Sequence, residues 1–307
     1  MCYSAQVQAE YSKFRRETGA DMDLDSYIRI FWWQEGKDPR REKVPRAAER
    51  DILEHGPAEL AEMIRRWDAW ETDKLTQEVF AQRRRVADAE RALQVKETKK
   101  ARDDVRIGTN KVAAAQRRLD VLKGKPSDQD RRVYPGVYCP VLVSEGGRRV
   151  VKLMRYQCRP AGKPALYDRK FPGTYNARRD NLEGFWGGLF GRQHGIMIAD
   201  RFYEHVEVEG ENRILEFVPR TGEPMLVACL WSSWSDPKGV EPELLSFAAI
   251  TDDPEPEVAA AGHDRTIINI KPEHVDAWLN PDPSNLEALY AIFDDKQRPY
   301  YEHRIAA

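Results

Sequence analysis

The residue with the most distinctive chemistry in this chain is Cys2, which directly follows the initiator methionine. Removal of Met1 would leave a thiol and an α-amine on the same residue. A 1,2-aminothiol of this kind condenses with an aldehyde and closes a thiazolidine ring, which an internal cysteine cannot do. The ordinary pKa of a terminal amine leaves a useful fraction neutral at physiological pH, and the thiol needs only modest help to ionise. Cys2 is therefore a candidate nucleophile.

Three downstream residues have the types that such a condensation needs: Asn176, Glu204 and His263. Imine formation protonates a leaving hydroxyl and deprotonates an attacking amine, so a carboxylate and an imidazole are natural acid–base partners. A neutral amide can hold the terminus without adding charge. Each residue alone also fits an ordinary structural role: a turn cap for Asn176, a solvated strand carboxylate for Glu204 and a surface histidine for His263.

Composition limits the class of protein more than it identifies a partner. The chain has 307 residues and a net charge of -2, so global charge indicates no ligand. No apolar run approaches the ~20 residues of a membrane span, and the N-terminus lacks the apolar region of a secretory signal. The four cysteines form no CxxC pair, so we expect no metal, no cofactor and no disulfide framework. A reduced cytoplasmic setting fits best, associated with the nucleoid if the source is bacterial.

Helices are predicted on either side of a charged connector over residues 36–56, which contains two prolines. LDSYIRIFWW (24–33) has a core-facing side, and residues 57–123 carry an apolar stripe at helical spacing. The latter segment holds 16 Lys/Arg and 12 Asp/Glu. Because Gly108-Thr109-Asn110 supplies a break, we expect a second helix over 110–123. The pattern predicts an antiparallel helical hairpin within an insertion over residues 36–128.

After Pro126 the spacing of the apolar residues changes from that of helices to that of β-strands. Residues 133–158 read as two strands around a Gly146-Gly147 turn. Further strands are expected within 194–210, 212–234 and 244–253, and a helix is expected to open at Pro272. The predicted fold is α+β: a β-rich, barrel-like domain of mixed or antiparallel strands, made from residues 1–35 and 129–307, with the helical hairpin inserted.

Several short motifs together resemble the SRAP family, named for SOS response-associated peptidases. The match begins with Met1-Cys2 and continues with Asn176-Ala177-Arg178. IADRFYEHV (198–206) is similar to the family's Ala-Asp-Gly-Phe-Tyr-Glu-Trp. His263-Asp264-Arg265 is similar to the start of its His-x-Arg-Met-Pro. The resemblance extends through VYPGVYCPVLV (133–143), GEPMLVACLWSSW (222–234) and the segment 244–281.

This resemblance implies a sensor of abasic sites in single-stranded DNA. Family members lose Met1 and trap the ring-opened sugar aldehyde as a thiazolidine DNA–protein crosslink, with lyase and autopeptidase activity also implied. By motif position, Cys2 would be the crosslinking nucleophile and Asn176 would orient it. Glu204 would transfer protons, and His263 would assist Schiff-base chemistry and crosslink reversal.

The resemblance also implies a DNA path through arginines, which fork onto phosphate oxygens. Arg178 and Arg265 match the family's DNA-contacting arginines. Three departures put that path in question. The usual Cys-Gly-Arg is Cys2-Tyr3-Ser4, and Ala-Asp-Gly ends in Arg201, which could add a phosphate contact. The usual Arg-Trp-Gly is Arg155-Tyr156-Gln157, where Tyr156 could still stack on a base but the backbone freedom of the glycine is gone.

Two other classes of function stay open on the sequence. An N-terminal-nucleophile amidohydrolase would also use Cys2, with its own amine as base. A non-catalytic adaptor would instead act through the helical hairpin, whose arginine clusters could bind a protein partner, a second copy or nucleic acid. Retention of Met1 would favour the adaptor, while its loss keeps both chemical hypotheses.

Overall fold

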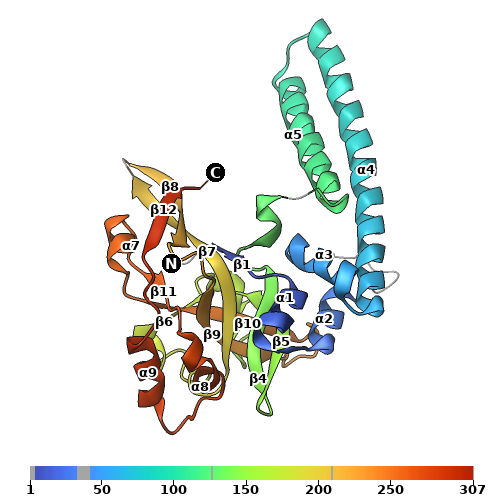
Figure 1. Cartoon of the computed structure of the whole chain (residues 1–307). Coiled ribbons are helices and arrows are strands. Elements are labelled where there is room, and N and C mark those ends of the chain that lie inside the picture. The colour runs from blue at the N-terminus through green and yellow to red at the C-terminus, as the bar shows by residue number, and fades with distance from the viewer. Residues whose placement is uncertain (1–3, 33–41, 126, 209, 307) are drawn as a thin grey trace. The chain divides into compact units, whose positions relative to one another are not determined.

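The computed structural model describes residues 4–32, 42–125, 127–208 and 210–306. Cys2 lies outside the described residues. The chain divides into two compact units, one containing residues 1–30, 42–55 and 131–307 and the other containing 31–41 and 56–130 (Figure 1). Residues 42–55 thus belong to the larger unit, although the sequence-based boundaries assigned them to the insertion.

The secondary structure of the larger unit is mainly β, with short helices between and after the strands. The helices outside the hairpin are α1 (Tyr11–Thr18), α2 (Leu24–Phe31), α3 (Arg46–His55), α6 (Tyr167–Lys170), α7 (Pro256–Ala260), α8 (Val275–Leu279) and α9 (Leu286–Asp294). The strands are β1 (Ser4–Val7), β2 (Asp21–Met22), β3 (Arg132–Val133), β4 (Tyr138–Glu145), β5 (Arg148–Tyr156), β6 (Asn176–Arg178), β7 (His194–Val208), β8 (Glu211–Pro219), β9 (Met225–Trp234), β10 (Leu244–Asp252), β11 (Thr266–Ile267) and β12 (Tyr301–Ile305).

These strands form one mixed sheet whose main path runs β11-β10-β5-β4-β7-β1-β3. Because β9 pairs with both β7 and β10, a closed circuit of paired strands runs through β10, β5, β4, β7 and β9. Two joins of this circuit are short, since β4 meets β7 at one register pair and β10 meets β5 at two. The sheet is therefore barrel-like, and the predicted α+β class is confirmed.

The β4–β5 hairpin follows the prediction closely. Its turn is made by Gly146 and Gly147, with φ of 56° and 76°. Two consecutive left-handed residues are the geometry of the tight hairpin turn that matches strand twist, and glycine adopts it without a Cβ penalty. The predicted strands at 194–210, 212–234 and 244–253 and the helical turn opening at Pro272 are also present.

The strand β7 lies at the centre of the sheet. It is 15 residues long and pairs with β9 and β4 along its first half and with β1 and β8 along its second. Ser4 of β1 lies opposite Tyr203, and the next residue of β7 is Glu204. The beginning of the described chain is thus bonded to the strand that carries the predicted acid–base glutamate.

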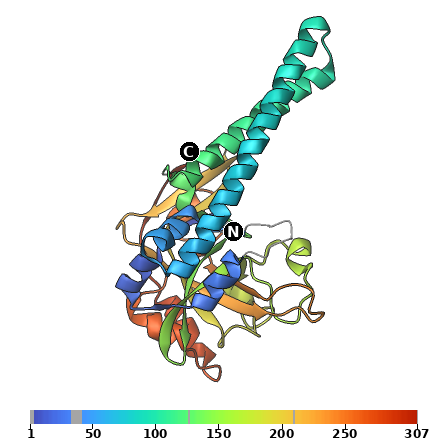
Figure 2. The same ribbon diagram turned by 90° about the vertical axis from the view of Figure 1, so that its right-hand side faces the viewer.

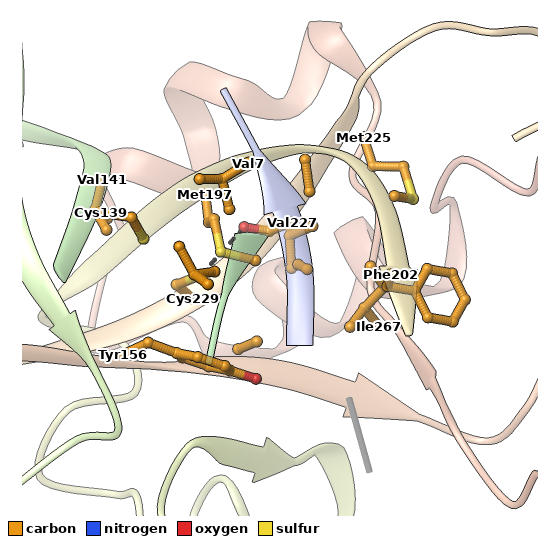
Figure 3. Close-up of a cluster of buried hydrophobic side chains, with 14 of the residues drawn as sticks. Val7, Cys139, Val141, Tyr156, Met197, Phe202, Met225, Val227, Cys229 and Ile267 are labelled. Carbon is orange, nitrogen blue, oxygen red and sulfur yellow. Dashed lines mark hydrogen bonds between the residues drawn. The ribbon is translucent and has the colours of Figure 1, made fainter. Parts of the chain in front are cut away.

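The core lies on both faces of the central strands. On β7, Met197 and Ala199 enter one apolar cluster, while Ile196 and Ile198 enter the other. The strand β9 alternates in the same way, with Cys229 in the first cluster shown in Figure 3. Since successive side chains of a strand point to opposite faces, burial of both faces explains why these strands are continuously apolar.

The smaller unit contains a long antiparallel hairpin of α4 (Ala58–Val95) and α5 (Lys99–Leu122), seen side by side in Figures 1 and 2. The hairpin is as predicted, but its turn is not at Gly108. The chain turns at residues 96–98, and the Thr98 side chain caps α5 by accepting a hydrogen bond from the Ala101 N–H. A threonine N-cap satisfies a helix terminus without glycine or proline.

Gly108 lies inside α5, where it allows the two helices to approach. A Cβ at position 108 would lie 2.6 Å from Cγ2 of Val86 on α4. Glycine lowers helix propensity, which is why the sequence suggested a break, but here it serves packing. Ion pairs between Arg85 and Asp104 and between Arg118 and Glu71 fix the same register.

Candidate functional site: a buried carboxylate–imidazole pair beside a polar cleft

The centre of the site is a contact between Glu204 and His263. Their Oε2 and Nε2 atoms are 3.3 Å apart, and the side chains are 1% and 8% exposed. Glu204 comes from β7, whereas His263 comes from the loop between α7 and β11. The fold therefore brings together two of the predicted site residues that are far apart in the sequence.

Two hydrogen bonds hold the loop that carries His263. The Glu255 N–H donates to Oγ1 of Thr266 across the ends of this segment, and the His263 N–H donates to the carbonyl of Val258. Gly262 has a φ of 95°, a left-handed conformation that favours glycine directly before the histidine. The loop is thus closed on itself, which fixes the direction of the imidazole.

The imidazole ring is oriented from its other nitrogen. Nδ1 of His263 lies 2.9 Å from the carbonyl oxygen of Arg265 and 3.3 Å from its backbone nitrogen. The shorter contact favours a proton on Nδ1, which leaves the Nε2 lone pair directed at Glu204. A hydrogen bond between Nε2 and the carboxyl group then requires one proton held between them, as in a proton-transfer pair.

Burial lowers the pKa of His263 from its usual range, and the hydrogen bond to Arg265 opposes this only in part. The neutral imidazole is consequently favoured at neutral pH. A neutral imidazole can accept a proton, so the site holds a base under the conditions where a terminal amine is also reactive.

Asn176 is placed by β6, which pairs in parallel with β10. Its side chain is buried and accepts a hydrogen bond of 3.4 Å from the Tyr156 hydroxyl. The Tyr156 ring is fully buried and stacks on Phe247 with ring centroids 5.2 Å apart. A base-stacking role for Tyr156 needs an exposed face and does not fit this position; its hydroxyl instead holds the amide of Asn176.

A polar cleft of about 490 Å³ lies at the end of β10. Thr251 of β10 pairs with Arg178 on one side and with Ile267 of β11 on the other. The cleft consequently receives Arg178, two residues after Asn176, and Arg265, two residues after His263. Its remaining lining residues are Arg179, Asp180, Asp252, Asp253, Asp264 and Tyr290.

The two cleft arginines differ in exposure. The Arg178 side chain is 53% exposed and its guanidinium donates to both carboxylate oxygens of Asp180 at 2.7–3.0 Å. The Arg265 side chain is only 15% exposed and lies 3.4 Å from Asp264. Exposed ion pairs are weak and exchange readily, so Arg178 can leave Asp180 for a stronger anion such as a phosphate.

The other two arginines of the predicted DNA path are held by carboxylates within the protein. Arg155 shares Asp168 with Arg159, and all three side chains are at most 15% exposed. Burial alone would raise the pKa of Asp168, but the bonds to Arg159 and Arg155 outweigh it and lower that pKa. Arg201 is bound to Glu216 at 3.0 Å. Both arginines thus have fixed carboxylate partners within the protein, and each carboxylate is shared with a second arginine.

A surface cluster of aromatic and basic residues was missed by the sequence reading. The rings of Tyr167 and Phe171 are 4.7 Å apart, and Phe185 stacks on Tyr167 at 6.4 Å. The ammonium group of Lys163 lies 5.4 Å from the Tyr167 ring. Phe171 and Phe185 are 45% and 40% exposed. The alternation of cations and aromatics in KPALYDRKF (163–171) was the available signal, since exposed rings beside cations are typical of base-stacking surfaces.

The described cysteines are not candidates for surface chemistry. Cys139, Cys158 and Cys229 are all fully buried. Burial raises the pKa of the Cys158 thiol to about 12 and those of the other two above their usual range. Since the thiolate is the reactive form, these three residues are unreactive at neutral pH.

The family model of the SOS response associated peptidase family, SRAP, matches residues 91–304. The match covers well over half of the chain, so the chain belongs to this family, whose members are associated with the DNA-damage response. It includes Asn176, Glu204 and His263, while Cys2 precedes the matched residues. No curated protein matches the sequence.

Several solved structures of low sequence identity match part of the chain. A protein of Bordetella bronchiseptica is 18% identical, with a TM-score of 0.48 over 58% of this chain and 87% of that one. A Bacteroides thetaiotaomicron protein is 15% identical, with a TM-score of 0.48 over 62% and 88%. A phage-related protein of Bordetella bronchiseptica is 17% identical, with a TM-score of 0.44 over 59% and 84%.

Two features are absent from the part of the chain that the structure describes. None of its helices combines the length and apolar character needed to cross a membrane. Nor do the described residues contain a group of three or more His, Cys, Asp or Glu side chains placed to hold a metal ion.

Proposed function

We propose that this SRAP protein recognises abasic sites in single-stranded DNA and binds them covalently through Cys2 after removal of Met1. The observation that carries the proposal is the buried Glu204–His263 pair, a proton-transfer device at 3.3 Å within a family associated with DNA damage. A ring-opened abasic site is an aldehyde, the electrophile that a 1,2-aminothiol captures.

Chain connectivity supports the participation of Cys2. Ser4 is bonded into the sheet opposite Tyr203, next to Glu204. Cys2 precedes Ser4 by two residues, and two residues of extended chain span at most about 7 Å. The covalent chain therefore keeps the Cys2 amine and thiol within reach of the end of β1 that adjoins Glu204.

The proposed chemistry uses the pair as proton donor and acceptor. The Cys2 amine adds to the aldehyde carbon and gives a carbinolamine, whose hydroxyl takes a proton from the pair and leaves as water. The nitrogen returns a proton to the pair as the imine forms. The Cys2 sulfur then attacks the imine carbon, and the proton of the thiol passes to the ring nitrogen. One C–N and one C–S bond form, one water is released, and no oxidant or cofactor is required.

In this proposal the amide of Asn176 orients the reacting terminus, held by its bond to Tyr156. Arg178 and Arg265 bind the sugar-phosphate backbone from the polar cleft. The exposed rings of Phe171 and Phe185 supply the base-stacking surface that the buried Tyr156 does not. Backbone contacts position the strand and stacking tolerates any base, so the proposed recognition is of the lesion and not of a sequence.

The kinetics of adduct formation with an abasic single-stranded oligonucleotide test the proton-transfer assignment. Glu204→Gln keeps the side-chain shape, and His263→Asn removes the ring nitrogen that faces Glu204. Each should slow the reaction by about 100-fold or more, within the ~10²–10⁴ range of general acid–base catalysis. The rate should also fall as pH drops through the lowered pKa of His263, below its usual range.

Glu207→Gln and His205→Asn are matched controls, because both residues lie on β7 with exposed side chains. They should react at the wild-type rate. Adduct formation by Glu204→Gln and His263→Asn at the wild-type rate would remove the pair from the mechanism.

A further inference from the structure

The helical hairpin carries a charge asymmetry that the site does not use. Residues 83–106, which form the end of the hairpin around the α4–α5 turn, contain nine Lys/Arg and five Asp/Glu. The rest of the segment, 57–82 and 107–123, contains seven of each. All the net positive charge of the hairpin therefore lies in its distal part.

The cations of the distal part extend further into solvent than the acids beside them. The Asp104 side chain is 18% exposed, while Lys100, which pairs with it, is 89% exposed. The Arg106 side chain is 67% exposed and that of its partner Asp103 is 43% exposed. The Arg91 side chain is 73% exposed, compared with 56% for the aspartate that it pairs with. Because lysine and arginine stems are longer than the aspartate stem, the outer surface is more basic than the composition alone indicates.

Four of the distal cations, Arg83, Arg84, Lys96 and Lys99, are exposed and take part in no ion pair within the described ranges of the hairpin. Between α4 and α5 at this level lies a hollow of about 480 Å³, lined by four alanines and Thr98, by three cations and by two aspartates that are paired with cations of the same region. The small alanine side chains leave room for a phosphate to approach both helices.

We propose that residues 83–106 form a second DNA-contact surface, which binds the phosphate backbone irrespective of sequence and of any abasic site. Lysines and arginines that replace condensed counterions on DNA supply such binding without reading bases. DNA is the polyanion indicated by the family of the chain. This inference does not depend on Cys2 or on the chemistry proposed above.

The test is binding of the full chain to an intact, labelled DNA duplex, followed by fluorescence anisotropy at several salt concentrations. The variant Arg83→Gln/Arg84→Gln/Lys96→Gln/Lys99→Gln removes four exposed charges and keeps good helix formers. Its slope of log affinity against log salt should be less negative by about 3 to 4, because each phosphate contact contributes ~0.9. Its adduct yield with a saturating abasic oligonucleotide should equal that of the wild type.

The matched control is Lys74→Gln/Lys111→Gln/Arg117→Gln/Lys123→Gln, which makes the same change in net charge at exposed positions on the remainder of the hairpin. It should bind the duplex with the wild-type slope. Unchanged binding by the distal variant, or an equal loss in the control, would overturn the proposal. Arg83→Lys/Arg84→Lys preserves charge and should retain binding; its failure would also contradict a purely electrostatic contact.

Discussion

Gln157 offers a direct measure of backbone strain next to the site. Its φ is 103°, a conformation that favours glycine and that no other described non-glycine residue adopts. Its side chain donates to the carbonyls of Asp168 at 3.0 Å and Pro172 at 3.3 Å, and its N–H donates to Phe247. A non-glycine residue in this region costs on the order of 1–3 kcal/mol. The two side-chain bonds offset that cost, at roughly 1 kcal/mol each.

Replacement by glycine and by alanine separates these contributions. Gln157→Ala loses both side-chain bonds and keeps the strain, so its free energy of unfolding should fall by about 2 kcal/mol. Gln157→Gly loses the same bonds and relieves the strain, but its unfolded chain is more flexible by ~0.5–1 kcal/mol. The glycine variant should therefore be more stable than the alanine variant by about 1 kcal/mol.

Urea denaturation of the two variants at pH 7.5 measures this difference. Equal stabilities, or greater stability of Gln157→Ala, would refute the assignment of strain to this residue. Since Gln157 follows Tyr156, which holds Asn176, adduct formation by Gln157→Gly should also be retained if glycine reproduces the same backbone.

Further predictions concern the hairpin and a buried histidine. Gly108→Leu should destabilise the α4–α5 hairpin by about 1–3 kcal/mol in thermal melts followed at 222 nm, because overpacking against Val86 outweighs the gain in helix propensity; unchanged melting would contradict the close approach at this glycine. His194 accepts from the Gly191 N–H through Nε2 and lies 2.9 Å from the Trp278 carbonyl through Nδ1, and burial lowers its pKa to about 3. In the unfolded chain His194 becomes protonated near its ordinary pKa of 6.5, whereas in the folded chain it stays neutral down to about pH 3. The free energy of unfolding therefore has its full value above pH 6.5 and falls as the pH is lowered towards 3. The loss should reach about 2 kcal/mol between pH 7.5 and 5, and urea titrations of His194→Gln over the same range should show a flatter profile than the wild type.

Much of the larger unit could be predicted because its signals are local. Glycine pairs, alternation of apolar residues and short motifs lie within a few residues of the structures they determine, as in the Gly146-Gly147 turn. The hairpin turn was predicted at the wrong place for the same reason. Gly108 is a strong local signal for a helix break, but its packing partner Val86 lies on the other helix, so neighbouring residues do not indicate the contact.

The site could be predicted as a set of residue types but not as a geometry. Nothing in the sequence indicates that His263 directs Nε2 to Glu204 or that Tyr156 is buried against Phe247. Those contacts depend on the pairing of β10 with strands from three other parts of the chain. Long-range strand pairing depends on the whole core. The sequence therefore did not indicate that Arg155 and Arg201 form ion pairs with carboxylates of the protein.

The most direct test of the central proposal is intact mass spectrometry of the chain after incubation with an abasic single-stranded oligonucleotide. The account predicts a heat-stable adduct whose protein part lacks Met1, and no adduct from Cys2→Ala. Since the three described cysteines are buried, they should not substitute. An equal adduct from Cys2→Ala, or an adduct on protein that retains Met1, would contradict the proposed role of Cys2.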